Sequence, residues 1–376
     1  MADLTRWTVE PAGRTEYGPG VLAELPAFVD SLGHARVFVV TDRGLRATGI
    51  VGRVEKILTA AGIEHVVHED VGPNPSTAEL DCGAARLREF GAATVLALGG
   101  GSALDAAKGI SLLAGNPGAA AADADRLWDA SDGLPLIAVP TTAGTGAETN
   151  GFGVTEDRCT RRKVYIGHSS VRPRIAVLDP ELTLGLPAAV TAATGLDALV
   201  HGIESLASRG ATPFSAAYAT QAVELVGRWL PVACRDGGDL AARSGLMLGA
   251  HLAGHALTLS GLGLVHGIGH ALTAHTGTPH GVALAAVLEE VMAFSEPAAA
   301  EAYEATAWAL RRPGAAIEAV REISGVLGIK RPLRELGVTR ADVPAIAAAA
   351  VADAVTKNTP RLPSEGEVAE LLHGVY

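Results

Sequence analysis

The sequence has little cysteine and little charge. Its 376 residues include three cysteines, Cys82, Cys159 and Cys234, and charged residues make up only 19% of the chain. So few cysteines, without a CxxC spacing, exclude a disulfide scaffold and favour a reducing, cytoplasmic setting. Apolar residues reach 48%, which is too many for an intrinsically disordered chain.

Basic residues are the minority among the charged ones. The chain has 30 Lys and Arg against 41 Asp and Glu, a formal charge of −11. A chain of this sign is poorly suited to the phosphate backbone of nucleic acids or to an anionic membrane surface. Its first residues, MADLTRWTVEPAGRTEY, contain no apolar run of the kind a secretory signal needs. We therefore expect an enzyme with a small-molecule substrate and no nucleic-acid or membrane partner.

Charge is missing altogether from residues 244–288, a stretch of 45 residues without Asp, Glu, Lys or Arg. A stretch of this length could cross a bilayer. Six of the chain's 12 histidines lie in it, however: His251, His255, His266, His270, His275 and His280. Because ionisable side chains are costly within a bilayer, we interpret the stretch as buried helices that carry a polar site.

The two halves of the chain have different periodicities. In the first half, strand-like runs alternate with helical patterns, which indicates a doubly wound, mainly parallel sheet in an α/β domain. The predicted strands are 36–40, 63–69, 93–98, 134–140 and 174–180, and the predicted helices are 45–61, 77–90 and 102–114. Gly185 and Pro187 then interrupt the pattern. The predicted domains are an α/β domain over 1–186 and an all-α domain over 187–376.

The second half contains mostly helical patterns, rich in Ala and Leu. The predicted helices are 188–208, 214–229, 240–258, 264–275, 280–293, 297–311, 314–327 and 340–356.

A glycine-rich turn follows the predicted strand 93–98. The segment LALGGGSALDAAK could bring the backbone N–H groups of Gly100, Gly101 and Ser102 to a phosphate at the start of a helix. The turn is not a GxGxxG fingerprint, because Leu104 stands where the last glycine should be, and it lacks the Lys-Ser/Thr ending of a P-loop. Phosphate binding and an ordinary strand-to-helix turn are therefore both open.

Two further features fall at the same expected sheet edge. The loop PTTAGTGAETN, residues 140–150, follows a predicted strand and offers several hydroxyl groups. Asp42 follows the strand 36–40, where a carboxylate could accept both hydroxyls of an adenosine ribose and repel a 2′-phosphate. An N-cap is an equally good reading of Asp42.

Histidines and an aspartate recur at helical spacing in the second half. Asp197 and His201 are four residues apart, as are His266 and His270, and His280 stands at the start of the next predicted helix. One carboxylate and three imidazoles suit a divalent transition metal with open positions for a substrate oxygen. In an uncharged core, either a cation or mutual hydrogen bonds must satisfy these groups. We interpret three other histidines as structural: His251, His255 and His275.

These motifs, in this order, resemble the iron-containing (group III) alcohol dehydrogenase family, whose fold is shared with glycerol dehydrogenase and dehydroquinate synthase. The resemblance spans the chain. It rests on YGPGVLAEL, VVTDRGL, GPNPS, LALGGGSALDAAK, PTTAGTGAET, KVYIG, DPELTLGLP, TGLDALVHGIES, LVHGIGHAL, TPHGVA and NTPR.

The resemblance implies a cleft between the two domains that holds NAD(P) above a divalent metal, with Fe²⁺ expected first and Zn²⁺ second. The implied metal ligands are Asp197, His201, His266 and His280. Implied pyrophosphate contacts are Gly100, Gly101 and Ser102, and the other implied cofactor contacts are Asp42, Asn74, Asp105, Thr141, Thr142, Thr145 and Lys163. His270 matches a histidine beside the metal that helps to relay a proton. A homodimer is the family expectation, and Asp42 favours NAD over NADP.

The implied activity is hydride transfer between nicotinamide and a small alcohol or aldehyde. Gly151, Phe152, His255 and Leu257 differ from the usual family residues, so the substrate is open. A cluster of basic residues could favour an anionic phosphonate aldehyde, although a solvated loop is the preferred reading: Arg158, Arg161, Arg162, Lys163, Arg172 and Arg174. The alternatives are a dehydroquinate-synthase-like lyase that uses NAD transiently, and a non-catalytic nucleotide-binding protein.

Overall fold

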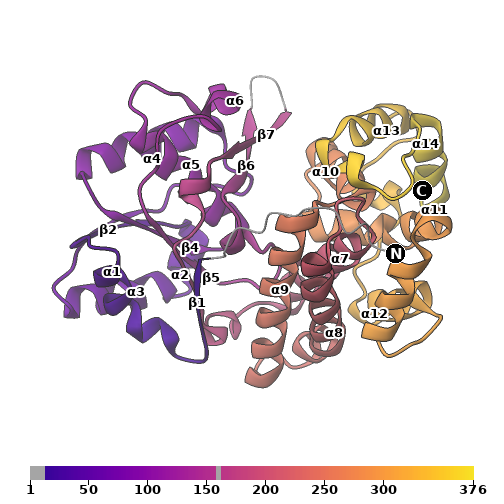
Figure 1. Ribbon diagram of the computed structural model, residues 1–376, viewed down its shortest axis with the longest axis horizontal. Helices are drawn as coiled ribbons and strands as arrows, with labels where there is room; N and C mark the ends of the chain where they lie inside the picture. The colour runs from indigo at the N-terminus through magenta and orange to yellow at the C-terminus, as the bar shows by residue number, and fades with distance from the viewer. Residues whose placement is uncertain (1–12, 158–161) are drawn as a thin grey trace. The chain divides into compact units, whose positions relative to one another are not determined.

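The computed structural model describes residues 13–157 and 162–376 (Figure 1). Arg158, Arg161 and Cys159 lie outside the described residues. The chain divides into two compact units, which we treat separately. The α/β unit runs to Thr142 and continues over Ala147–Gly185, and the helical unit comprises Ala143–Gly146 and Leu186–Tyr376.

The α/β unit is built on a parallel sheet of six strands in the order β1-β8-β5-β4-β2-β3. The strands are β1 (Arg14–Tyr17), β2 (Arg36–Val40), β3 (Glu64–His68), β4 (Thr94–Gly99), β5 (Leu136–Pro140) and β8 (Ile175–Leu178). Five of them confirm the sequence prediction. The edge strand β1 was not predicted, because its sequence RTEY is polar and largely exposed.

Helices cover both faces of this sheet (Figure 1). They are α1 (Leu25–Ser31), α2 (Arg43–Ala47), α3 (Ile50–Ala60), α4 (Thr77–Phe90), α5 (Gly101–Gly115) and α6 (Ala124–Leu127). In β2, Phe38 and Val40 pack into the core beneath α4 and α5, whereas Val37 and Val39 pack into the core shared with α1 and α3. This alternation confirms the doubly wound α/β fold.

Two local predictions for the α/β unit were incomplete. The predicted helix 45–61 is two helices, since Gly49 adopts the left-handed backbone (φ 87°) between α2 and α3. The sequence also did not predict an antiparallel hairpin, β6 (Phe152–Asp157) with β7 (Arg162–Gly167). Short 3₁₀ turns complete the unit: Val21–Glu24, Ala121–Asp123, Ala147–Thr149, Ser169–Val171 and Pro180–Thr183.

The helical unit contains the long helices of the second half. They are α7 (Ala188–Ala207), α8 (Pro213–Arg235), α9 (Leu240–Ser260), α10 (Leu264–Thr276), α11 (His280–Ala309), α12 (Ala316–Leu327), α13 (Val343–Ala352) and α14 (Glu365–Gly374), with 3₁₀ turns at Leu333–Leu336 and Ala354–Asn358. The predicted helices 280–293 and 297–311 both lie in α11, which is kinked at the non-helical Ala299 just after Pro297, so the predicted break between them is present as this kink. The predicted helix 340–356 stops at Ala352, and α14 was not predicted.

Glycine lets the helices of this unit approach closely. A Cβ on Gly195 of α7 would lie 2.3 Å from Leu230, and one on Gly245 of α9 would lie 2.2 Å from Trp229. α7 and α9 can therefore pack directly against α8, and their buried polar residues lie in the core of the unit.

The uncharged stretch 244–288 forms most of α9, all of α10 and the start of α11. Among the described residues, no single helix has the length and apolar composition to span a membrane; α9 and α10 meet those criteria only as a pair bent by 104°.

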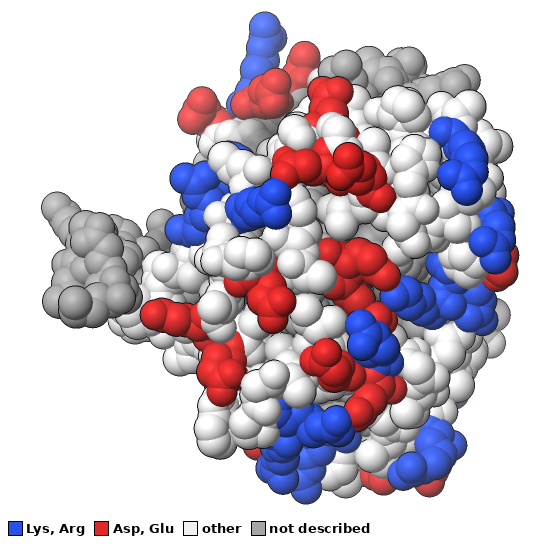
Figure 2. Space-filling view, turned by 90° about the vertical axis from the view of Figure 1, so that its right-hand side faces the viewer, with Lys and Arg blue, Asp and Glu red and all other residues white. Residues whose placement is uncertain are grey.

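The surface charges are mixed in sign. On the face drawn in Figure 2, Asp and Glu side chains alternate with Lys and Arg side chains. The net negative charge of the chain is therefore not collected into one area of this face.

Candidate functional site

Helix α7 carries three buried ionisable residues on one face. Asp197, His201 and Glu204 follow each other at spacings of four and three residues, which places them along the same side of the helix. Their exposed fractions are 4%, 4% and 7%. Burying such groups is costly unless each one has a partner, so this face of α7 is a candidate functional site.

Two other helices bring their first residues to Asp197. α10 begins at Leu264 and presents His266 in its first turn, and α11 begins at His280. Gly269 of α10 permits this approach, since a Cβ there would lie 2.4 Å from Leu284 and 3.5 Å from the His280 ring. The three helices thus place their imidazoles around one carboxylate.

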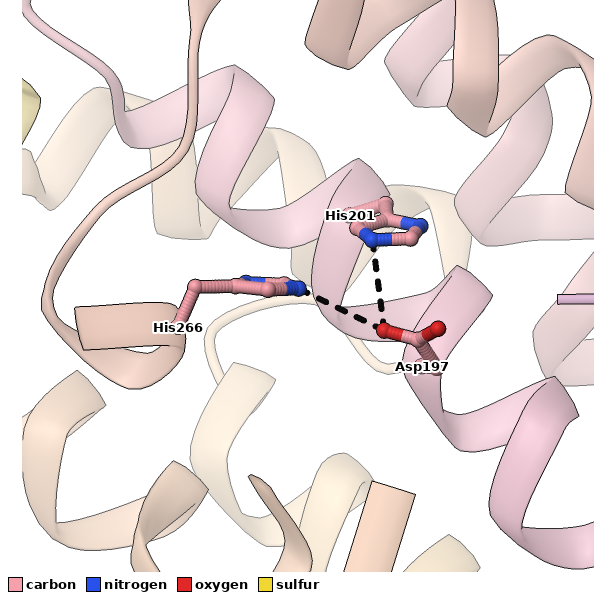
Figure 3. A group of neighbouring side chains, drawn as sticks. All are labelled: Asp197, His201 and His266. Carbon is pink, nitrogen blue, oxygen red and sulfur yellow. Dashed lines mark hydrogen bonds and ion pairs between the residues drawn. The ribbon is translucent and has the colours of Figure 1, made fainter. Parts of the chain in front are cut away.

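One oxygen of Asp197 is the centre of this group (Figure 3). Asp197 Oδ1 lies 3.2 Å from His201 Nε2, 3.3 Å from His266 Nε2 and 3.8 Å from His280 Nε2. The His201 and His266 rings stack with their centroids 4.8 Å apart. All four predicted ligands are therefore brought together, with Asp197, His201 and His266 forming the tightest group.

The pKa values of Asp197, His201 and His266 are shifted in different directions. Burial alone would raise the pKa of Asp197, but the adjacent His201 and the hydrogen bond from His266 hold it well below its usual value. Burial lowers the pKa of His201 to about 4, with Asp197 opposing the shift. Burial also disfavours charge on His266, but hydrogen bonds to Asp197 and Glu204 outweigh it and raise its pKa to about 9. A carboxylate that stays ionised in the core is a strong site for a cation.

The donor set fits a divalent transition metal. Two ligand atoms bound at about 2.1 Å to a tetrahedral ion lie roughly 3.4 Å apart, and the Asp197–imidazole distances of 3.2–3.8 Å bracket this spacing. Mutual hydrogen bonding satisfies part of the group, as the contact between His266 Nε2 and Asp197 Oδ1 shows.

A carboxylate that was not predicted stands behind His266. Glu204 Oε2 accepts from His266 Nδ1 at 2.6 Å, and the same side chain accepts from the backbone N–H groups of Gly263 and Val265. The sequence does carry a signal for it, because Glu204 follows His201 by one helical turn in an otherwise apolar segment. The second nitrogen of His266 is thereby turned toward Asp197.

A second unpredicted carboxylate holds His270. Asp353 Oδ2 lies 2.9 Å from His270 Nδ1, and Asp353 Oδ1 accepts from the N–H of Val355. Burial acts to raise the pKa of Asp353, but the hydrogen bond and charge of His270 together with the N–H of Val355 outweigh it, and the pKa is lowered. His270 also stacks on His280, with ring centroids 5.4 Å apart, so it lies beside the group.

In the α/β unit, the two predicted loops meet at the carboxyl edge of the sheet. Gly99 ends β4 with φ 148°, and Gly100 precedes the first turn of α5. Thr141 N donates to Gly99 O, and the Thr142 side chain lies about 3.5 Å from the Cβ position of Gly100. The N-terminus of α5, with Gly101 and Ser102, is therefore lined by threonines of the neighbouring strand end.

Asp42 caps a helix at the same edge. Its Oδ1 accepts from Leu45 N at 2.9 Å, and its Oδ2 lies 3.7 Å from the Cβ position of Gly99. The N-cap reading is thus correct, and Oδ2 faces the glycine turn. Asn74 is exposed and left-handed (φ 52°) directly before Pro75, which is an unusual backbone conformation that often marks a functional position.

Asp105 is tied to the hairpin that covers α5. Its Oδ2 accepts from Val154 N at 3.0 Å, and Lys108 Nζ lies 3.5 Å from its Oδ1. Lys108 is fully buried and also donates to Asn150 and to the carbonyl of Phe152. Lys163 lies on β7, paired in register with Glu156.

Thr145 is the one predicted cofactor contact that belongs to the helical unit. Its neighbours pack closely there: a Cβ on Gly144 would lie 2.6 Å from the Thr194 carbonyl, and one on Gly146 would lie 2.4 Å from Gly254. The glycines flanking Thr145 therefore seat the loop against α7 and α9.

Comparison with known proteins agrees with this arrangement. Residues 12–180 match the family model of iron-containing alcohol dehydrogenases, and residues 191–376 match that of the C-terminal domain of the same family. This chain belongs to the iron-containing alcohol dehydrogenase family. The resemblance inferred from the motifs is confirmed.

Individual relatives of this dehydrogenase span nearly its whole length. It is 37% identical to the probable alcohol dehydrogenase EutG of Escherichia coli, over 94% of this chain and 91% of that one. The crystal structure of a 1,3-propanediol oxidoreductase matches with a TM-score of 0.92 at 32% identity, covering 99% and 100% of the two chains. A sulfoacetaldehyde reductase from Bifidobacterium kashiwanohense, solved with NAD⁺, matches with a TM-score of 0.90 at 26% identity over 99% of each chain.

Proposed function

We propose that this dehydrogenase is metal-dependent and NAD(H)-linked, and that it interconverts a small alcohol and its aldehyde. The observation that carries the proposal is the convergence of three imidazole nitrogens on Asp197 Oδ1 at 3.2, 3.3 and 3.8 Å. Asp197, His201, His266 and His280 are the proposed ligands. The family description makes Fe²⁺ the first candidate. We propose Zn²⁺ as the second, because it also takes imidazole and carboxylate ligands.

A divalent cation held by these residues supplies Lewis acidity toward the oxygen of the substrate. Asp197 is the only one of the four ligands with a negative charge, and its lowered pKa keeps that charge in place throughout the neutral range. His201 is held neutral by burial, which suits a ligand nitrogen.

His270 is the proposed proton relay. Its Nδ1 is engaged by Asp353 at 2.9 Å, which orients the ring, and we propose Nε2 as the nitrogen that takes up or releases a proton. Histidine exchanges protons near neutral pH, and a neighbouring carboxylate stabilises its charged form. We propose that the His270–Asp353 pair moves the proton of the alcohol.

The cofactor residues are proposed in the α/β unit, together with Thr145. The N-terminus of α5 at Gly100, Gly101 and Ser102 suits the pyrophosphate, since its N–H groups are unpaired within the helix. Asp42 Oδ2 faces the same turn and suits the ribose hydroxyls of NAD, while its charge disfavours the 2′-phosphate of NADP. The other proposed contacts are Asn74, Asp105, Thr141, Thr142 and Lys163.

The substrate class is proposed as small alcohols and aldehydes, with an anionic aldehyde as the second candidate. The structural relative named as a sulfoacetaldehyde reductase acts on such an anion. Lys163, Arg172 and Arg174 are the described members of the basic cluster whose side chains bear on this choice. A phosphonate aldehyde therefore belongs in the test set.

The test is a screen of NADH oxidation with metal-stripped protein and each metal returned separately. Neutral aldehydes such as propanal and lactaldehyde are compared with sulfo- and phosphonoacetaldehyde. We expect stoichiometric NADH consumption that depends on the added metal. If the metal-bound protein instead releases phosphate from the substrate of dehydroquinate synthase, with no net change in NADH, this result supports the lyase. Protein that retains no metal and full activity contradicts the proposal.

A further inference from the structure

Glu204 stands at the junction of two helices of the helical unit. It lies on α7, one turn beyond His201, and its carboxylate reaches the start of α10. α10 begins after Gly263, which has no side chain that could cap the helix. A helix start left without an acceptor exposes unpaired N–H groups in the core, which is costly.

The Glu204 carboxylate accepts three hydrogen bonds at this helix start. Oε1 accepts from Val265 N at 2.7 Å, and Oε2 accepts from Gly263 N at 3.1 Å and from His266 Nδ1 at 2.6 Å. A carboxylate at a helix N-terminus also interacts favourably with the helix dipole. Glu204 therefore supplies the cap of α10 from α7 and fixes the position of α10 along α7.

The bond to His266 decides which ring nitrogen faces the proposed ligands. An ionised carboxylate can only accept, so Nδ1 of His266 must carry a proton. The remaining nitrogen, Nε2, is the one that lies 3.3 Å from Asp197 Oδ1. A cation bound by Nε2 would replace the proton that Nε2 shares with Asp197 in the metal-free protein, while Nδ1 keeps its proton on Glu204.

A small cavity of about 20 Å³ lies behind the same carboxylate. Its polar lining residues are Glu204, Ser295, Tyr303, Asn358 and Thr359. Thr359 is 1% exposed, and its Oγ1 has no hydrogen-bond partner among the described residues. Glu204 Oε1 and Thr359 Oγ1 both border the space beside Gly263, at 3.0 Å and 3.4 Å from its Cβ position.

The size and polarity of this cavity fit one water molecule. A water needs at least about 10–15 Å³ and two to four polar partners, whereas empty cavities are apolar. A water here would satisfy the Thr359 hydroxyl and add a further donor to Glu204. Burial raises the pKa of Tyr303, another lining residue, so its hydroxyl stays protonated.

We propose that Glu204 is the positioning residue of the metal centre, which fixes the tautomer of His266 and the start of α10, and that one buried water joins it to Thr359. The proposal rests on the proposed function only in that His266 is taken to be a metal ligand. It assigns no proton transfer to Glu204.

The first test measures metal affinity in Glu204→Gln. Glutamine keeps the size of the side chain but has only one oxygen to accept hydrogen bonds from the three donors. At least one backbone N–H group therefore loses its acceptor, or His266 Nδ1 is no longer held in its protonated form. Metal-stripped protein is titrated with Zn²⁺ against a chromophoric chelator. We expect an affinity 10–100-fold weaker than that of the unsubstituted protein.

Glu289→Gln is the matched control. Glu289 is a buried carboxylate of the same unit, 6% exposed, paired with Arg321 and Lys330 rather than with a histidine. We expect this variant to bind Zn²⁺ as the unsubstituted protein does. Equal weakening in both variants, or none in Glu204→Gln, overturns the proposal. Failure of the unsubstituted protein to bind Zn²⁺ instead overturns the proposed function.

A second measurement needs no variant, in case Glu204→Gln does not fold. The measurement is NMR of the Zn²⁺-loaded protein, with its histidines ¹⁵N-labelled and their signals assigned to individual residues. We expect His266 to show a protonated Nδ1 and a metal-bound Nε2. Metal on Nδ1 contradicts the role of Glu204. A high-resolution crystal structure should show one water within hydrogen-bond distance of Thr359 Oγ1, absent in Thr359→Val, and an empty cavity removes the water from the proposal.

Discussion

The helical unit makes its candidate site from side chains, whereas the α/β unit makes its own from backbone. Asp197, His201 and His266 are at most 4% exposed and hold each other through their polar atoms. The glycine turn at the end of β4 has few polar side-chain atoms, and its shape comes from the φ of Gly99 and the start of α5. The first kind of site depends on which atoms are present, and the second on which conformations the chain can adopt.

This difference also explains how the two sites are supported. The side-chain site has an outer layer of carboxylates, Glu204 behind His266 and Asp353 behind His270. The backbone site is supported by a hydrogen-bonded strand end, with Thr141 N donating to Gly99 O, and by the packing of the hairpin on α5. Substitutions should therefore act through lost ligand atoms in one unit and through altered backbone in the other.

The largest expected effect is from His266→Ala. Loss of a ligand nitrogen also leaves Glu204 facing an empty space, so we expect both retained metal and turnover to fall below detection. Metal content by elemental analysis and NADH oxidation are measured on the same preparation. His251→Ala removes a buried histidine of the same unit that is not among the proposed ligands, and it should keep the metal. If His266→Ala loses the metal and keeps full activity, catalysis does not need a metal held by these side chains, and the proposed site is wrong.

The next effect is from His270→Ala. The metal should stay bound, because His270 is not a proposed ligand, while kcat falls by about 10²–10⁴-fold through loss of the proton relay. Asp353→Asn keeps the imidazole and weakens only its orientation, so a smaller fall in kcat is expected. Loss of metal in His270→Ala would make it a ligand instead. An unchanged kcat would remove it from the proton path.

Sequence patterns predicted most of this architecture because burial leaves a periodic trace. Five of the six sheet strands were predicted: four as apolar runs, since strands covered on both faces are apolar, and the edge strand β3 from its central valines. The edge strand Arg14–Tyr17 and the hairpin β6–β7 were not predicted, because exposed or half-buried strands carry mixed polar residues. Gly49 shows that one residue can divide a helix in a way the periodicity does not reveal.

The candidate site was predictable only where residue type carries the chemistry. Asp197 and the histidines are rare residues in an uncharged region, so their spacing is visible in the sequence. Glu204 and Asp353 were not predicted, because a carboxylate that acts by orienting an imidazole has no fixed spacing from it: Asp353 is 83 residues from His270. Thr145 could not be assigned to the helical unit from sequence, since that depends on the packing of Gly144 and Gly146.

A third effect tests the backbone site through Gly99→Ala. The φ of 148° disfavours a side chain, and the new Cβ would lie 2.8 Å from that of Ala103. Strain of roughly 1–3 kcal/mol should reshape the turn and weaken NADH binding about tenfold or more, as measured by fluorescence titration, without changing metal content. Gly52→Ala in α3, where a Cβ meets nothing within 4 Å, should leave NADH affinity unchanged. Unchanged affinity in Gly99→Ala would mean that the cofactor does not use this turn.

The smallest effect separates the two roles of Asp42, a charged side chain beside the glycine turn. Asp42→Gly should shift cofactor preference toward NADP by about tenfold, because the loss of one charge-assisted hydrogen bond costs about 1.5 kcal/mol at the lower end of its range. It also removes the cap on Leu45 N. Asp42→Asn keeps a capping oxygen but loses the charge, so it should shift the preference without lowering Tm. The ratio of kcat/KM for NADH and NADPH decides between the roles: a shift in both variants assigns Asp42 to the ribose, whereas a ratio unchanged in both leaves Asp42 as a helix cap alone.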